Sequence, residues 1–343
     1  MLIAATGFLN SCSTPPEFDE AEWYRKTRAA DRSLLYAPHV NEDGNFFNPW
    51  LSRERISRGG RFLGKKRKYD YPKEKYAWVK NDYSYLMDKE FDSISYYGHA
   101  TLLIKMNGET IITDPFFSNA ALVVRKKVRI KFDYAKLPDR PVILITHNHY
   151  DHLDKSSVRN LIKKDAVFIV ALGLKEMFVK WGAKEVYELD WWENIQLGGI
   201  TYTFLPAQHW SRRIGQPGGS TLWGSFLIEG SRTVYFSGDS GYFIGFKEFG
   251  ERYSIDYALL GVGAYDPRWF MHYAHMNVPE FFDAADETKA RQVIPLHFGV
   301  ISLSDEPITY PLYEIDEHMR KNPDTTQNIC PLRVGEFIRM DRE

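Results

Sequence analysis

The stretch Thr146-His147-Asn148-His149-Tyr150-Asp151-His152 holds four potential metal ligands within six residues. His147 and His149 are alternate residues, so in an extended or tightly turned loop both side chains point the same way and can bind one ion. Asp151 and His152 are adjacent and diverge, so a turning loop can direct them to a second ion. Imidazole and carboxylate donors suit zinc without any thiolate. Because the whole chain has only ten histidines, three of them here predict a metal-binding loop rather than a polar surface loop.

Four side chains cannot saturate two ions, so further ligands must come from distant positions. His209, Asp239 and His297 are the candidates, in the contexts Pro206-Ala207-Gln208-His209-Trp210, Phe236-Ser237-Gly238-Asp239-Ser240-Gly241 and Pro295-Leu296-His297-Phe298-Gly299. Each follows a predicted strand, and ligands collect at the carboxyl ends of strands in open α/β sheets. Taken alone, each of the three is as well explained by a structural hydrogen bond, and the prediction depends on the whole set.

Hydrophobic periodicity predicts an α/β fold with two packed sheets and helices outside. We expect strands over 93–97, 101–106, 109–113, 142–146, 167–171, 186–189, 200–206, 225–229, 233–237, 257–262 and 292–297. Asn107-Gly108 and Gly230-Ser231 are turn signals for two hairpins. Helices are expected near 155–164 and 173–181, and one begins at Pro279 with Asn277 as its N-cap and Glu280 three residues later.

The N-terminal part is less regular. Residues 13–90 predict an irregular arm wrapped on the core, with a short helix near 19–30. Residues 1–12 are apolar and end in Leu9-Asn10-Ser11-Cys12, which resembles a bacterial lipobox with Cys12 as the lipidated residue, but they lack a basic n-region. Two interpretations fit this segment. It is either the remnant signal segment of a cell-envelope lipoprotein whose reading frame is shortened, or the frayed end of a cytoplasmic or peripheral membrane protein.

Composition narrows the function classes. The formal net charge is −1, so no global field draws the chain to nucleic acid, and we expect no nucleic-acid partner. There are two cysteines, Cys12 and Cys330, and no apolar run of transmembrane length. Two stretches are strongly basic: residues 53–75 contain ten basic residues and three acidic ones, and residues 125–131 read RKKVRIK. Such stretches form either a solvated surface or a patch that faces phosphate or lipid. The second alternative is considered because the apolar residues Phe46, Phe47, Trp50 and Leu51 lie just before the first stretch.

The ligand order HxHxDH, His, Asp, His after Thr113-Asp114-Pro115 resembles the metallo-β-lactamase superfamily. Four segments are similar to one branch of this superfamily, the N-acyl-phosphatidylethanolamine-hydrolysing phospholipase D. They are Gly98-His99-Ala100-Thr101, Thr113–Ser118, Ala264–Met271 and Phe47-Asn48-Pro49-Trp50. The resemblance implies a four-layer αββα sandwich over 91–343. It also implies two Zn²⁺, one held by His147, His149 and His209 and the other by Asp151, His152 and His297, with Asp239 bridging. Iron or manganese suits these donors too. Asp114 resembles a buried acid that orients the ligand loop, and for His99 a structural role is favoured over a catalytic one.

This branch implies a phosphodiesterase that uses a metal-bridging hydroxide to release phosphatidic acid and an N-acylethanolamine. The expected partner is a phospholipid or another phosphodiester, with association with a membrane surface and a homodimer as further expectations. Asp151 and His275 are the candidate catalytic residues, and His275 matches a histidine of the branch near the metals, whereas His272 has no match. Gln208 and Trp210 could line the pocket. The alternatives are a lactonase or another metal-dependent hydrolase of a small phosphorylated substrate, and a non-catalytic metal-binding lipoprotein.

Overall fold

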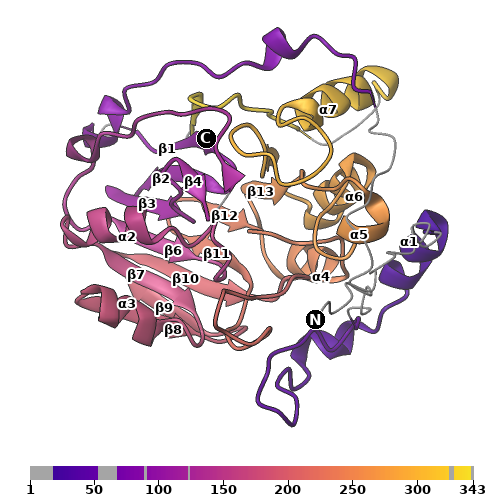
Figure 1. Cartoon of the computed structure of the whole chain (residues 1–343), viewed down its shortest axis with the longest axis horizontal. Helices are drawn as coiled ribbons and strands as arrows, with labels where there is room; N and C mark the ends of the chain where they lie inside the picture. The colour runs from indigo at the N-terminus through magenta and orange to yellow at the C-terminus, as the bar shows by residue number, and fades with distance from the viewer. Residues whose placement is uncertain (1–17, 53–67, 89–90, 123, 324–327, 341–343) are drawn as a thin grey trace, which may run out of the picture.

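Two mixed β-sheets form the centre of the computed structural model, which describes residues 18–52, 68–88, 91–122, 124–323 and 328–340. The seven-stranded sheet has the order β15-β1-β2-β3-β6-β7-β8, and the six-stranded sheet has the order β14-β13-β12-β11-β10-β9. Helices α2 and α3 lie on one side of the pair of sheets and α4 to α7 on the other (Figure 1). The predicted αββα architecture is confirmed.

The strands of the first sheet are β1 Ser93–Gly98, β2 Thr101–Met106, β3 Glu109–Thr113, β6 Val142–Ile145, β7 Val167–Ala171, β8 Glu185–Leu189 and β15 Phe337–Arg339. Those of the second are β9 Asn194–Leu197, β10 Ile200–Leu205, β11 Ser225–Glu229, β12 Thr233–Phe236, β13 Tyr257–Gly261 and β14 Gln292–Leu296. A small separate pair is β4 Ala120–Ala121 with β5 Val124–Arg125. The helices are α1 Glu20–Arg28, α2 Lys155–Ile162, α3 Lys175–Trp181, α4 Gly245–Arg252, α5 Arg268–Met271, α6 Val278–Thr288 and α7 Tyr310–Lys321, with 3₁₀ turns η1 Arg32–Tyr36, η2 Lys73–Tyr76, η3 Ser84–Met87 and η4 Tyr134–Lys136.

The predicted hairpins and caps are present. Asn107 and Gly108 both have positive φ (54° and 80°) and turn β2 into β3, as the hairpin signal indicated. Asn277 caps α6, and its side chain and that of Glu280 form the reciprocal capping box. Strands β6 and β7 are buried on both faces, which explains their continuous apolar runs.

Several elements were not predicted. Strand β9 pairs with β10 through Gly198-Gly199, a turn signal that sequence analysis had passed over. Strand β15 is only three residues long and pairs with β1 from the far end of the chain. Helices α4 and α7 were also missed, although both bury one face of apolar residues.

The described residues of the arm are mostly irregular, with helix α1 and the 3₁₀ turns η1, η2 and η3. Asp19 caps α1 within the predicted 19–30 segment. Trp50 and Leu51, which just precede the first basic stretch, are buried at 6% and 7% exposure, whereas Phe47 is 40% exposed. The lipobox-like segment and most of the basic stretch from Arg53 lie outside the described residues.

The side chains of the second basic stretch, residues 125–131, differ in their exposure to solvent. Lys126 is buried and its Nζ donates to the carbonyl oxygen of Phe116, whereas Arg125, Lys127, Arg129 and Lys131 are exposed. The solvated-surface interpretation is therefore wrong for Lys126. Among the described residues, no helix has both the length and the apolar character that spanning a bilayer requires.

Candidate metal centre

The predicted ligands lie at one edge where the two sheets meet. His147 follows β6 of the first sheet, whereas His209, Asp239 and His297 follow β10, β12 and β14 of the second. Because loops after strand ends of both sheets converge there, residues up to 150 positions apart in the sequence become neighbours.

Among the described residues, two groups of four donor residues result, each with its donor atoms within 4.8 Å of one another. The first group is His147, His149, His209 and Asp239, which matches the predicted first site with its bridging carboxylate. The second group is His99, Asp151, His152 and His297. The structure thus brings together all seven side chains named as metal ligands from the sequence, and adds His99.

Asp239 lies between the two groups. Its Oδ2 is 3.1 Å from His152 Nε2 and 3.7 Å from His209 Nε2, and its Oδ1 is 2.8 Å from His297 Nε2. A carboxylate has two oxygens and can face two ions at once, whereas an imidazole nitrogen offers one lone pair. The position of Asp239 therefore suits a bridging ligand.

The donor atoms fit divalent cations. Within the described residues, the buried atoms His152 Nε2, His297 Nε2 and Asp239 Oδ1 make no hydrogen bond of good geometry, although Asp239 lies 2.8 Å from His297 Nε2 and 3.1 Å from His152 Nε2. A buried polar atom without a partner costs about 1–3 kcal/mol. Three such atoms aimed into one cluster are better explained as ligand atoms than as three unrelated defects.

Asp114 supports the ligand loop from beneath. Its Oδ1 accepts from the backbone N of Thr146 (2.8 Å), and its Oδ2 accepts from Thr146 Oγ1 (2.6 Å) and lies 2.8 Å from His152 Nδ1. With Nδ1–H donated to Asp114, His152 directs Nε2 at the cluster. Burial disfavours a charged ring, yet Asp239 and Asp151 raise the pKa of His152 well above its usual value, so this carboxylate-rich site favours positive charge.

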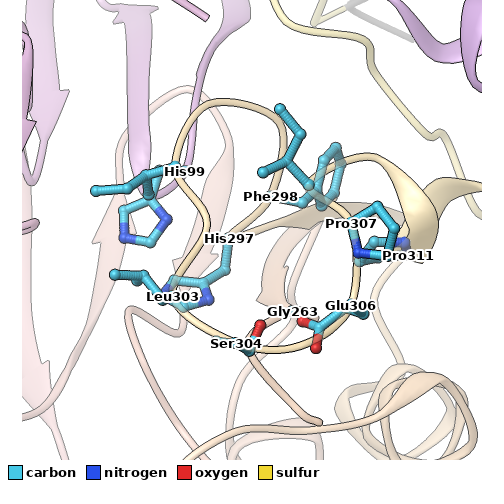
Figure 2. A pocket seen from close by; sticks show the side chains of 12 residues that line it. His99, Gly263, His297, Phe298, Leu303, Ser304, Glu306, Pro307 and Pro311 are labelled. Carbon is cyan, nitrogen blue, oxygen red and sulfur yellow. The ribbon is translucent and has the colours of Figure 1, made fainter. Parts of the chain in front are cut away.

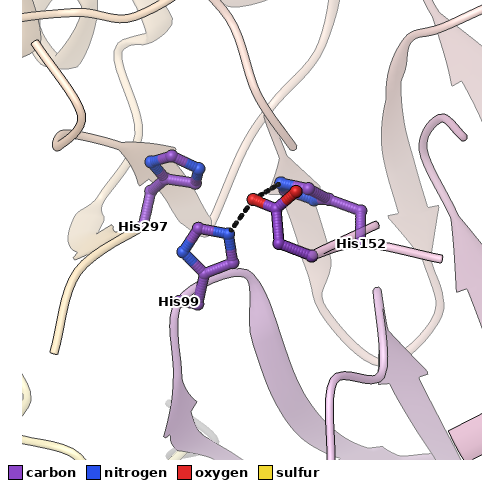
Figure 3. A group of neighbouring side chains, drawn as sticks. His99, His152 and His297 are labelled. Carbon is purple, nitrogen blue, oxygen red and sulfur yellow. Dashed lines mark hydrogen bonds and ion pairs between the residues drawn. The ribbon is translucent and has the colours of Figure 1, made fainter. Parts of the chain in front are cut away.

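His99 is in the second donor group. The rings of His99, His152 and His297 surround one point (Figure 3), with centroids 4.1 Å apart for His99 and His297 and 5.0 Å for His99 and His152. His99 Nε2 lies 2.7 Å from Asp151 Oδ2, and burial lowers the pKa of His99 to about 4. A neutral His99 can donate to Asp151, which orients this carboxylate.

His275 lies beside the donor groups. Its ring centroid is 5.4 Å from that of His209 and 5.1 Å from that of His297, and it forms a further group with Asp239 and His297. His272 instead stacks on Phe18 of the arm at 4.3 Å. Of these two histidines, only His275 is placed to reach a substrate at the metal centre.

A small pocket lies behind His297. Figure 2 shows His99 and His297 on one side of it and Pro307 and Pro311 on the other. Glu306 also lines it and accepts from the backbone N of Tyr265 (3.2 Å) and of Asp266 (3.0 Å), which anchors the segment that leads to His275.

Next to the centre lies a groove of about 590 Å³, lined by Tyr150, Trp210, Arg212, Arg213, Ile214, Gly215 and Gln216. The rings of Trp210 and His149 are packed edge to face with their centroids 4.4 Å apart, so the groove adjoins the first donor group. Gln208 does not line it, because its side chain is fully buried and bonded to Trp50. The expectation for Trp210 as a pocket residue is met, and that for Gln208 is wrong.

The role of Arg213 beside the ligand loop was not predicted from the sequence. Its Nη1 donates to the carbonyl oxygens of Asn148 (2.7 Å) and Leu153 (3.0 Å), and its guanidinium lies 3.8 Å from the ring centroid of Tyr150. One side chain thus bridges the two ends of the ligand loop. No local signal distinguishes Arg213 from its neighbour Arg212.

Comparisons with known proteins agree with this geometry. The family model of the beta-lactamase superfamily domain matches residues 109–298, which is more than half of the chain, and the protein belongs to the metallo-β-lactamase superfamily. With its buried His/Asp clusters, it is a metal-dependent hydrolase of this fold.

Two relatives are named as phospholipases. The chain is 34% identical over 227 residues to N-acyl-phosphatidylethanolamine-hydrolyzing phospholipase D 1 of Caenorhabditis elegans, covering 59% of this chain and 62% of that one. It is 33% identical over 226 residues to the mitochondrial enzyme of that name from Saccharomyces cerevisiae, covering 61% and 48%. The matches thus span less than two thirds of these relatives' own length. A metallo hydrolase from Ignicoccus hospitalis has the same fold, with a TM-score of 0.58 at 20% identity over 74% of this chain and 99% of that one.

Proposed function

We propose that this hydrolase is a phosphodiesterase of phospholipase D type that uses two Zn²⁺ and acts on phospholipids like N-acyl-phosphatidylethanolamine. The observation that carries the proposal is the pair of donor groups joined at Asp239, in a chain about one third identical to two enzymes with that named activity. The imidazole and carboxylate donors support zinc as the proposed metal, although iron and manganese suit them too.

The proposal assigns separate roles in metal binding and phosphate binding to residues of the chain. When bound, two divalent ions would polarise a water and neutralise charge on a phosphate, with His147, His149 and His209 holding one, Asp151, His152 and His297 holding the other, and Asp239 shared. His275 is proposed to donate an imidazole N–H to a phosphate oxygen, since its ring faces His209 and His297. Holding the phosphate in line in this way accounts for part of the barrier reduction.

The groove next to the first donor group supports an amphiphilic substrate. Trp210 and Tyr150 supply aromatic walls, Ile214 is 74% exposed, and Arg212 supplies a cation. An apolar surface next to a guanidinium suits a molecule with an acyl chain and an anionic headgroup. Association with a membrane surface and formation of a homodimer remain parts of the proposal.

The test compares substrate classes on the purified, zinc-loaded protein. N-Acyl-phosphatidylethanolamine in mixed micelles and bis(p-nitrophenyl) phosphate are assayed beside a panel of lactones. We expect phosphatidic acid and N-acylethanolamine as products, and no turnover by Asp239→Asn. Lactone hydrolysis without phosphodiester hydrolysis would replace this proposal with the lactonase alternative.

A further inference from the structure

Two buried side chains of the arm bond to the segment that ends in the predicted ligand His209. Asn48 is 3% exposed and Trp50 is 6% exposed, and both lie far outside the segment that the family model matches. The side-chain donors of both residues bond to His209, to Gln208 just before it, or to Tyr273 in the loop of His275. The arm is therefore more than an apolar cover for the sheets.

Asn48 uses both functions of its amide. Its Nδ2 donates to the carbonyl oxygen of His209 (3.2 Å) and to the hydroxyl of Tyr273 (2.8 Å), while its Oδ1 accepts from Trp223 Nε1 (3.0 Å). No other side chain of similar size offers two donors and an acceptor in this arrangement. Asn48 thus connects the backbone of a predicted metal ligand with the segment just before His275.

Trp50 fixes the orientation of Gln208. The indole Nε1 of Trp50 donates to Gln208 Oε1 (3.0 Å), which leaves Gln208 Nε2 to donate to the carbonyl oxygens of Tyr242 (3.1 Å) and Tyr273 (3.3 Å). Without the indole N–H, Gln208 Oε1 would lose this donor, and the side chain would be held by the two bonds from its Nε2. Gln208 directly precedes His209, so its placement sets the start of the ligand segment.

His209 is oriented within this framework. Its Nδ1 lies 3.3 Å from the carbonyl oxygen of Ala274, and its Nε2 lies 3.1 Å from His149 Nδ1. A proton on Nδ1 leaves the Nε2 lone pair directed at the first donor group. Any shift of the 208–209 backbone or of the 273–274 backbone would turn this ring.

We propose that Asn48 and Trp50 are positioning residues of the metal centre, so that the arm sets the affinity of the ion held by His147, His149 and His209. The inference rests on the two-metal centre of the proposed function and not on its substrate. It predicts an asymmetry, because among the described residues neither Asn48 nor Trp50 bonds to Asp151, His152 or His297.

The test measures zinc binding by the full chain, independently of turnover. Trp50→Phe and Asn48→Ala are compared with Trp192→Phe, a control that removes another indole bond between core and arm, from Trp192 Nε1 to the carbonyl oxygen of Leu35 (2.9 Å). The readouts are zinc ions per chain, two stepwise dissociation constants from competition with a chromophoric chelator, and urea unfolding with the chelator in excess.

We expect Trp50→Phe and Asn48→Ala to weaken one zinc ion by roughly ten- to a hundredfold and to leave the other unchanged, as residues behind metal ligands do. Trp192→Phe should keep both constants. Wild-type constants in both arm variants, or equal loss of both ions, would overturn the inference. If Asn48→Ala does not fold, Trp50→Phe decides alone. A wild-type protein that binds no divalent ion would refute the metal centre itself.

Discussion

Asp114 shows how one residue determines the geometry of a centre without facing it. The carboxylate is fully buried and bonds to Thr146 and His152 at once. Asp114→Asn keeps the shape but leaves only one oxygen to accept, so the His152 ring should lose its fixed tautomer. We expect zinc affinity to fall by roughly ten- to a hundredfold. Chelator competition measures this, and Asp154→Asn, at the cap of α2, is the matched carboxylate that should change stability but not zinc affinity.

One buried residue, Lys126, leads to a prediction of how the free energy of unfolding depends on pH. Burial lowers the pKa of Lys126 to about 7 from 10.5, so between these pH values the unfolded chain binds more protons than the folded one. The free energy of unfolding should therefore decrease as the pH falls through this window and level off below it. The slope from this one group is at most about 1.4 kcal/mol per pH unit.

Lys126→Met should remove that slope. Urea unfolding of wild type and variant between about pH 7 and pH 9 measures the difference. Lys127→Met, at the exposed neighbour, should keep the wild-type slope. Parallel pH profiles for wild type and Lys126→Met would show that the lysine is charged when folded.

At the scale of the element, the ligand loop depends on a residue outside it. Arg213→Ala would leave the carbonyl oxygens of Asn148 and Leu153 without this donor, and buried unsatisfied groups cost about 1–3 kcal/mol. We expect that loss in the free energy of unfolding of the metal-free protein, together with weaker zinc binding. Arg212→Ala, at an exposed side chain, should change stability by about 0.5 kcal/mol or less. Equal effects of the two substitutions would contradict the bridging role.

Elements with local signals were predictable, and those with distant partners were not. Buried strands such as β6 have continuous apolar runs, and the ligand loop is a short contiguous pattern, so both could be identified from the sequence. Strand β15 is recognisable only by its pairing with β1, more than 200 residues away. The same applies to Asn48, whose three partners lie in different loops, and to His99, whose place in the second donor group depends on the turn between β1 and β2.

At the scale of the whole molecule, the centre joins the two sheets. Its predicted ligands follow β6 of one sheet and β10, β12 and β14 of the other, so bound ions would crosslink layers that otherwise meet through apolar packing. An ion at a thousandfold excess over its dissociation constant stabilises the folded state by about 4 kcal/mol. Removal of the bound ions with a chelator should therefore lower Tm by on the order of 10 °C, as differential scanning calorimetry would measure. Asp239→Asn should have a low Tm with or without chelator. If chelation leaves the wild-type Tm unchanged, the seven side chains do not hold ions that join the sheets.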